Sequence, residues 1–170
     1  MKNRNIILAF LAMITIAFTS CEKDDPAGVP EFDNYFYAGF LPWNNTGVES
    51  VVRTQTTLVK FPVKLNSAAE HDFDAIAQYT LVTTGITNPA VAGQDFNIVD
   101  RSGNTLQPAN GIYSLSFPGA KEKVDTIYVK VLNSAVAGTR RIQINLVKNT
   151  TPQYTVGTFT QSYIRFLEVK

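Results

Sequence analysis

The sequence predicts an all-β protein, a single antiparallel β-sandwich of about seven or eight strands that follows an N-terminal signal peptide. Three observations carry this prediction. Short segments alternate apolar with polar residues, turn-forming segments rich in Gly, Pro and Asn separate them, and no sustained helical periodicity follows residue 20. Successive side chains of a strand point to opposite faces, so each segment would bury one face and expose the other. The predicted organisation is a signal peptide over residues 1–20, a tether over 21–30 and the sandwich over 31–170.

The strands themselves differ in how clearly they are patterned. Alternation is cleanest in four segments, residues 59–65, 113–117, 127–131 and 142–146. Further strands are predicted, from β-branched and aromatic content, over residues 78–83, 96–99 and 162–169. A short helical turn is expected near residues 68–72. Pro62 has no backbone N–H to donate, which predicts an edge strand or a bulge at that position.

The N-terminal segment has the features of an export signal. Lys2 and Arg4 precede an uncharged run over residues 6–18, which ends in the small polar residues Thr19 and Ser20. This order is typical of a signal peptide. The run is too short for a membrane span, which needs roughly 20 helical residues.

Cys21 is the single cysteine of the chain, so a disulfide within the chain is excluded. Residues 18–21 resemble the lipobox of bacterial lipoproteins, in which the cysteine sulfur carries a diacylglycerol. Phe18 and Ser20 replace the usual Leu and the usual Gly or Ala, as Bacteroidetes-type lipoproteins tolerate. The resemblance implies lipidation of Cys21, with the membrane as a partner through that lipid. The alternative is cleavage elsewhere, which leaves Cys21 as a free thiol.

The charged residues 22–25 directly follow the cysteine. They look like the acidic signal that sends such lipoproteins to the outer face of the outer membrane, which implies a cell-surface location. The alternatives are an ordinary solvated linker and a domain on the periplasmic face. At ~3.3 Å per extended residue, the tether would hold the domain within roughly 30 Å of its anchor.

The charge balance argues against nucleic acid as a partner. The chain has 15 basic and 14 acidic residues, and removal of residues 1–20 deletes two basic residues and no acidic ones. The remaining net charge is about −1, and Arg140 and Arg141 are the only adjacent basic pair. Nucleic-acid binders usually carry a clustered basic face.

Four segments in order, residues 92–96, 113–119, 124–132 and 140–146, resemble the successive motifs of Calx-beta-like domains, which uncharacterised Bacteroidetes-type lipoproteins share. The resemblance covers residues 58–170. It implies an immunoglobulin-like sandwich used in adhesion, surface scaffolding or binding.

In the calcium-binding Calx-beta members, the ions lie in loops rich in carboxylates, because Ca²⁺ takes several acidic oxygen ligands. The corresponding loop, residues 133–138, has no carboxylate here. Asp95 and Asp100 remain, but two carboxylates at that spacing more often cap turns. No metal and no cofactor are therefore predicted.

The sequence also contains no recognisable catalytic set. His71 is the only histidine and lies in a polar stretch, where a solvated loop residue is favoured over a general base. Asp72 and Asp74 could in principle form a glycosidase pair, but they are better explained as solvated loop charges. Known nucleophile, phosphate-binding and zinc motifs are missing from the sequence. A non-enzyme is predicted, with a cryptic hydrolase based on His71 as the weak alternative.

The most suggestive feature is a set of six aromatic residues within residues 32–43: Phe32, Tyr35, Phe36, Tyr37, Phe40 and Trp43. Aromatic faces are good platforms for sugars and for protein contacts. The alternative is that this stretch is the first strand, packed into the sandwich. Pro42 and the two asparagines after Trp43 predict a loop, so Trp43 is expected to be exposed. The candidate ligand-binding residues are Trp43, Tyr35 and Tyr37.

Together these observations predict a non-enzymatic, lipid-anchored cell-envelope module for binding or scaffolding, with an accessory role in glycan or nutrient capture as one version. The alternative is a structural or adhesion protein that contacts an envelope protein partner. The sequence names neither the ligand nor the oligomeric state.

Overall fold

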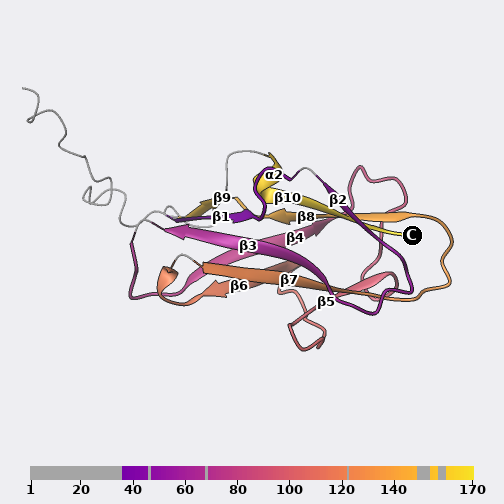
Figure 1. Cartoon of the computed structure of the whole chain (residues 1–170), viewed down its shortest axis with the longest axis horizontal. Coiled ribbons are helices and arrows are strands. Elements are labelled where there is room, and N and C mark those ends of the chain that lie inside the picture. Colours follow the sequence, from indigo (N-terminus) through magenta and orange to yellow (C-terminus); the bar gives the residue numbers. More distant parts are fainter. Residues whose placement is uncertain (1–35, 46, 68, 122, 149–153, 157–159) are drawn as a thin grey trace, which may run out of the picture.

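The computed structural model describes residues 36–45, 47–67, 69–121, 123–148, 154–156 and 160–170. They form two five-stranded sheets, and the strands of one lie over those of the other (Figure 1). Sheet A has the order β5 (Phe96–Val99), β7 (Lys123–Val131), β3 (Val59–Ser67), β1 (Phe36–Phe40) and β9 (Tyr154–Val156). Sheet B has the order β2 (Val48–Val51), β10 (Ile164–Val169), β8 (Arg140–Leu146), β4 (Ala75–Val82) and β6 (Ile112–Phe117). Neighbours are antiparallel except for β1 with β9 and β2 with β10, which are parallel.

The core lies between the sheets and consists of the apolar half of each alternating pattern. In β3 of sheet A, Val63 and Leu65 are fully buried, and in β8 of sheet B, Ile142 and Ile144 have at most 1% of their surface exposed. Fully burying side chains of this size contributes about 1.5–3 kcal/mol each. The period of two in the sequence therefore reflects a sandwich in which each sheet has one buried face and one solvent-exposed face. The predicted fold class is confirmed.

Three details differ from the prediction. The short strands β2 and β9 were not expected, because four and three residues are too few to show a period of two. Residues 69–74 are bends and irregular backbone instead of a helical turn. A single helical turn, α2 (Thr160–Tyr163), instead opens the segment that was predicted as strand from residue 162.

Pro62 was expected at an edge or a bulge, and this was wrong, because β3 is the central strand of sheet A. The register explains why proline is tolerated there. The Pro62 carbonyl accepts the Leu41 N–H at 2.8 Å, so the ring nitrogen points to the same side, just past the end of β1. The missing donor thus falls where the β1–β3 ladder has already ended.

The predicted signal peptide, the tether with Cys21, and Tyr35 lie outside the described residues. Within the described ranges, no helix has the length and apolar character that crossing a membrane requires.

Candidate functional site

The aromatic segment contributes to the core and to the surface. Phe36 and Phe40 of β1 are buried in the sandwich, as the first-strand explanation requires. Tyr37 lies between them on the opposite face and is 45% exposed. Trp43 lies in the turn after β1 and is 58% exposed, which confirms the exposure predicted from its neighbours. Of the three candidate binding residues, the structure thus places Tyr37 and Trp43 at the surface.

The turn that carries Trp43 is held by specific hydrogen bonds. Arg165, which is 4% exposed, donates from Nη2 to the Pro42 carbonyl at 2.6 Å. The Asn45 N–H donates to the same carbonyl at 3.1 Å. Arg165 also donates to the carbonyls of Gln161 and Ile164. The turn is therefore fixed to β10, which lowers the entropy that Trp43 would lose on contact with a ligand.

Arg165 is a buried cation among carbonyl groups and an aromatic ring. Its guanidinium carbon lies 5.0 Å from the centroid of the Phe40 ring. Burial lowers the pKa of Arg165 from its usual value. The positive charge is retained because a guanidinium remains protonated in proteins and carbonyl dipoles and the ring face both favour a cation.

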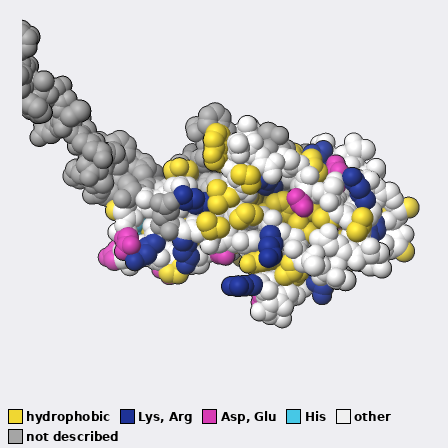
Figure 2. All heavy atoms as spheres, viewed as in Figure 1, with side chains coloured by type: hydrophobic (Ala, Val, Ile, Leu, Met, Phe, Trp, Pro, Cys, Tyr) yellow, Lys and Arg dark blue, Asp and Glu magenta, His cyan; other side chains and the backbone are white. Residues whose placement is uncertain are grey.

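The exposed face of sheet A mixes apolar and basic side chains. Lys60 pairs with Tyr128 and Lys64 with Val124 across the β3–β7 ladder, on the same face as Tyr37. Figure 2 shows apolar side chains gathered across the middle of the visible face, with Lys and Arg side chains between and around them. Such a surface offers stacking area together with hydrogen-bond donors.

At one end of the sandwich, a buried ion pair joins three loops. Arg53, between β2 and β3, donates from Nη1 to Asp95 Oδ1 at 2.7 Å. The same nitrogen donates to Ser134 Oγ at 2.9 Å, and Nη2 donates to the Gly138 carbonyl at 3.0 Å. Arg140 adds a second guanidinium, with its Nη1 at 3.9 Å from Asp95 Oδ2. The loop before β5 and the loop after β7 are therefore both tied to Arg53.

Asp95 is fully buried and remains charged. Burial alone would raise its pKa, but the hydrogen bonds from the Val91 N–H and from Arg53, together with the charges of Arg140 and Arg53, lower it overall. No sequence pattern singles out Arg53, since it is an isolated arginine in a loop.

The acidic residues that the structure describes can be checked for a metal site. The described residues contain no group of three or more His, Cys, Asp or Glu side chains placed to bind an ion. Asp100 caps a turn, as expected from the sequence, because its carboxylate accepts the N–H groups of Ser102 and Asn104 and the Asn104 side-chain amide. These hydrogen bonds lower the pKa of Asp100, and the bond from the Asn104 side-chain amide has the largest effect.

His71 lies close to a serine, but in the wrong arrangement for catalysis. Its Nε2 is 3.2 Å from Ser67 Oγ, while that hydroxyl donates its single proton to the Ala69 carbonyl at 2.6 Å. A serine nucleophile must instead donate to the histidine. The ring also stacks on Phe73 with centroids 4.7 Å apart, so His71 is half-buried and not the freely solvated residue expected from the sequence.

Asp72 and Asp74 are both exposed and differ in their contacts. Asp74 accepts the Gly119 N–H at 3.0 Å and so caps the turn η2 (Pro118–Ala120), while Asp72 is exposed. Gly119 has φ +66°, and a side chain there would be strained. The Asp74 carboxylate therefore stabilises a contact between two loops, and the Asp72 carboxylate is exposed to solvent.

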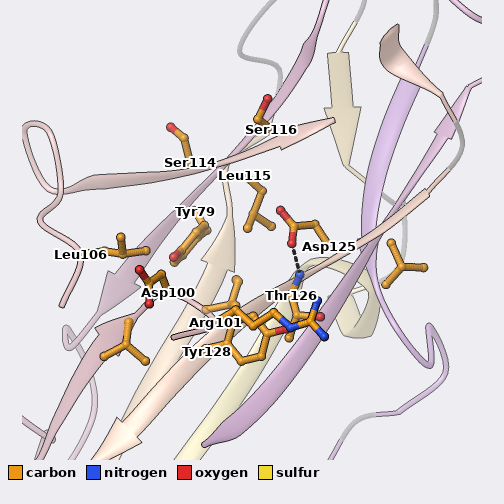
Figure 3. Close-up of a pocket in the computed structure, with 13 residues that line it drawn as sticks. Tyr79, Asp100, Arg101, Leu106, Ser114, Leu115, Ser116, Asp125, Thr126 and Tyr128 are labelled. Carbon is orange, nitrogen blue, oxygen red and sulfur yellow. Dashed lines mark hydrogen bonds between the residues drawn. The ribbon is translucent and has the colours of Figure 1, made fainter. Parts of the chain in front are cut away.

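A pocket of about 340 Å³ opens on the side of the sandwich where β6 meets β7 (Figure 3). β6 is the edge strand of sheet B, and β7 lies next to the edge strand β5 of sheet A. Tyr79 of β4 and Asp125 of β7 line the pocket, together with Asp100, Arg101 and Leu106 from the loop after β5.

Tyr79 is 1% exposed, and its hydroxyl has no hydrogen-bond partner among the described residues. Among the described residues, two side-chain nitrogens are fully buried and have no hydrogen-bond partner, Nε of Arg140 and Nε of Arg141. The Tyr79 oxygen is not one of them, so it keeps some exposed surface. Figure 3 shows this oxygen directed toward Asp100, among the residues that line the pocket. Burial raises the pKa of Tyr79, and the neighbouring Tyr113 and the charge of Asp125 raise it further, so the hydroxyl keeps its proton at neutral pH.

Comparison with known proteins confirms the fold and goes no further. The chain matches no protein-family model and no curated protein sequence. It is similar to the apo form of the CBD1 domain of Calx, with 16% identity and a TM-score of 0.50 over 80% of this chain and 98% of that domain. The calcium-binding domain CBD12 of CALX1.1 matches with 17% identity and a TM-score of 0.45 over 78% of this chain and 44% of that one.

A two-domain protein of unknown function from Bacteroides fragilis NCTC 9343 matches with 10% identity and a TM-score of 0.49 over 88% of this chain. This chain spans 51% of that protein, about half its length. The likeness to Calx CBD1 shows that the sandwich is Calx-beta-like, as the four sequence segments predicted.

Proposed function

We propose that this chain is a non-enzymatic binding module, tethered to the cell envelope by lipid on Cys21, that captures glycans through Trp43 and Tyr37. The observation that carries the proposal is the exposure of these two aromatic residues, Tyr37 on a strand whose other aromatic side chains are buried and Trp43, 58% exposed, in a turn held by hydrogen bonds. Sugars stack on exposed aromatic rings, and a fixed turn makes this contact less costly in entropy. The arrangement of Ser67 and His71 gives no support to a hydrolase.

Affinity electrophoresis of the complete chain tests the glycan proposal. Gels that contain neutral polysaccharides such as xylan, β-glucan, mannan or galactomannan are expected to retard the wild-type protein in at least one case. Trp43→Ala is expected to weaken that retardation about tenfold or more, since central aromatic residues carry 2 kcal/mol or more at binding hot spots. Trp43 is the only tryptophan, so its fluorescence reports directly on the contact.

Ile76→Ala is the matched control, because Ile76 is also an exposed apolar residue, 42% exposed, but lies on sheet B. It is expected to bind like the wild type. If no polysaccharide retards the wild-type chain, the glycan proposal fails, and crosslinking in intact cells then tests the alternative of an envelope protein partner.

The anchor has its own test. Cells grown with an alkyne-bearing fatty acid are expected to label the wild-type chain and not Cys21→Ser, because the sulfur is the proposed attachment atom. Fractionation is expected to find the wild type with the outer membrane, where two or more acyl chains hold a protein stably. Protease treatment of whole cells separates the surface from the periplasmic face. A wild-type chain without label, or one in the cytosol, contradicts the tether.

A further inference from the structure

We infer that the pocket between β6 and β7 is a second binding site, and that its ligand is a small uncharged hydroxylated molecule such as a single sugar unit. The inference goes beyond the glycan surface at Trp43. Sheet A has the order β5-β7-β3-β1-β9, so the turn after β1 and the pocket beside β7 lie toward opposite edges of the sandwich.

The first argument is the unpartnered hydroxyl of Tyr79. A buried polar group without a hydrogen bond costs about 1–3 kcal/mol, and buried tyrosines usually find a partner. The neighbouring buried Tyr113 serves for comparison. Tyr113 lies directly opposite it on β6 and stacks on its ring with centroids 5.1 Å apart, but Tyr113 does not line the pocket. The ring of Tyr79 is thus fixed, and its hydroxyl faces open space that a ligand can fill.

The second argument is the set of hydrogen-bonding groups around that hydroxyl. Asp125 accepts the Thr126 N–H at 2.7 Å through Oδ1, and its Oδ2 has no partner among the described residues. Arg101 is exposed and offers guanidinium donors at the rim. Tyr79 can both donate and accept. Neighbouring hydroxyl groups of a sugar ring can donate to the carboxylate and accept from the guanidinium at the same time.

The charged residues that line the pocket limit the kind of ligand that it can bind. Asp100 and Asp125 oppose one guanidinium, Arg101, which disfavours an anionic ligand. Both Asp100 oxygens are already occupied by its own loop, and Arg101 repels an amine, which disfavours a cation. Apolar side chains complete the walls and suit the C–H face of a sugar: Val99, Leu106, Leu115, Val124 and Ile127. The volume of about 340 Å³ lies at the small end of the range for ligand sites, roughly 300–1,000 Å³.

The test is a titration of the complete ¹⁵N-labelled chain in detergent with glucose, galactose, mannose, xylose and N-acetylglucosamine, followed by amide NMR. At least one sugar is expected to shift the amides of Thr126, Leu115 and Arg101 in a saturable way. Tyr79→Phe removes only the hydroxyl oxygen and is expected to weaken the binding at least fivefold. Tyr113→Phe is the matched control, with the same change in the stacked ring, and is expected to bind like the wild type.

Several outcomes overturn the inference. These are the absence of saturable shifts at the pocket, equal binding by Tyr79→Phe and the wild type, and saturable binding of ethylammonium or sulfate there in place of every sugar. The outcomes also distinguish the pocket from the proposed glycan surface at Trp43. Shifts confined to residues 41–45 and lost in Trp43→Ala support the proposed function while they refute the pocket. Pocket shifts that persist in Trp43→Ala support the pocket, whatever the outcome of the polysaccharide test.

Discussion

At the scale of single residues, Arg53 connects three loops through one guanidinium. Its guanidinium contacts a fully buried carboxylate, a serine hydroxyl and a carbonyl, and 11% of its side chain is exposed. We expect Arg53→Met to lower the free energy of unfolding by about 3 kcal/mol, because the buried Asp95 loses its closest countercharge. Urea denaturation at pH 7 measures this change.

Arg101→Met is the control for Arg53→Met, since Arg101 is exposed and makes no ion pair among the described residues. It is expected to change the stability by less than about 0.5 kcal/mol. Equal effects of the two substitutions would show that Arg53 contributes only as a surface charge.

The residues of the candidate sites differed in how well the sequence could predict them. Trp43 was predictable, because the proline and asparagines around it break the strand and force a loop. Tyr79 was not, because an inward-facing tyrosine in an alternating strand reads as an ordinary core residue. Only the three-dimensional arrangement shows that its hydroxyl opens into a pocket. Arg53 and Asp95 are 42 positions apart, and no local pattern links them.

At the scale of elements, β3 shows how register decides the effect of a proline. Pro62 and Lys64 lie on the same face of β3. The bond from Leu41 to Pro62 makes residues 39 and 64 the next hydrogen-bonded pair of the β1–β3 ladder. We expect Pro62→Ala to be nearly neutral, and Lys64→Pro to cost about 2 kcal/mol or more, because it removes a ladder donor opposite Gly39.

Thermal unfolding of both variants of β3 against the wild type measures the contrast. A Lys64→Pro chain as stable as the wild type would show that the β1–β3 ladder is not formed as described. The sequence alone could not place Pro62 in a central strand, because a missing donor indicates an edge unless the end of the neighbouring strand is known.

The same limit explains which elements were predictable. Strands β3, β7 and β8 are seven to nine residues long and contain five to seven residues of clean alternation with one buried face, so their existence followed from periodicity. β2 and β9 are short and pair in parallel with β10 and β1, which are distant in sequence. Their formation depends on the neighbouring strand being present, and a local pattern does not contain that information.

At the scale of the whole molecule, the Arg53–Asp95 network joins the two sheets. Arg53 follows β2 of sheet B, Asp95 precedes β5 of sheet A, and the loop with Ser134 connects β7 of sheet A to β8 of sheet B. One buried carboxylate therefore fixes the relative position of three connections at this end of the sandwich. Its protonation is expected to weaken the entire domain and not a single loop.

The pH dependence of stability tests this role of Asp95. Its pKa in the folded state is lowered below the value of about 3.9 that an unfolded Asp has, so the unfolded chain binds more protons in this range. The contribution of Asp95 is therefore complete above the unfolded pKa and is lost as the pH falls from about 4 through the folded pKa. Urea midpoints measured between pH 2 and pH 6 are expected to fall more steeply for the wild type than for Asp95→Asn, which has no proton to gain at this position. The gap between the two proteins should therefore be widest near pH 6 and should narrow toward pH 2, whereas a constant gap would mean that the Asp95 charge does not support the fold.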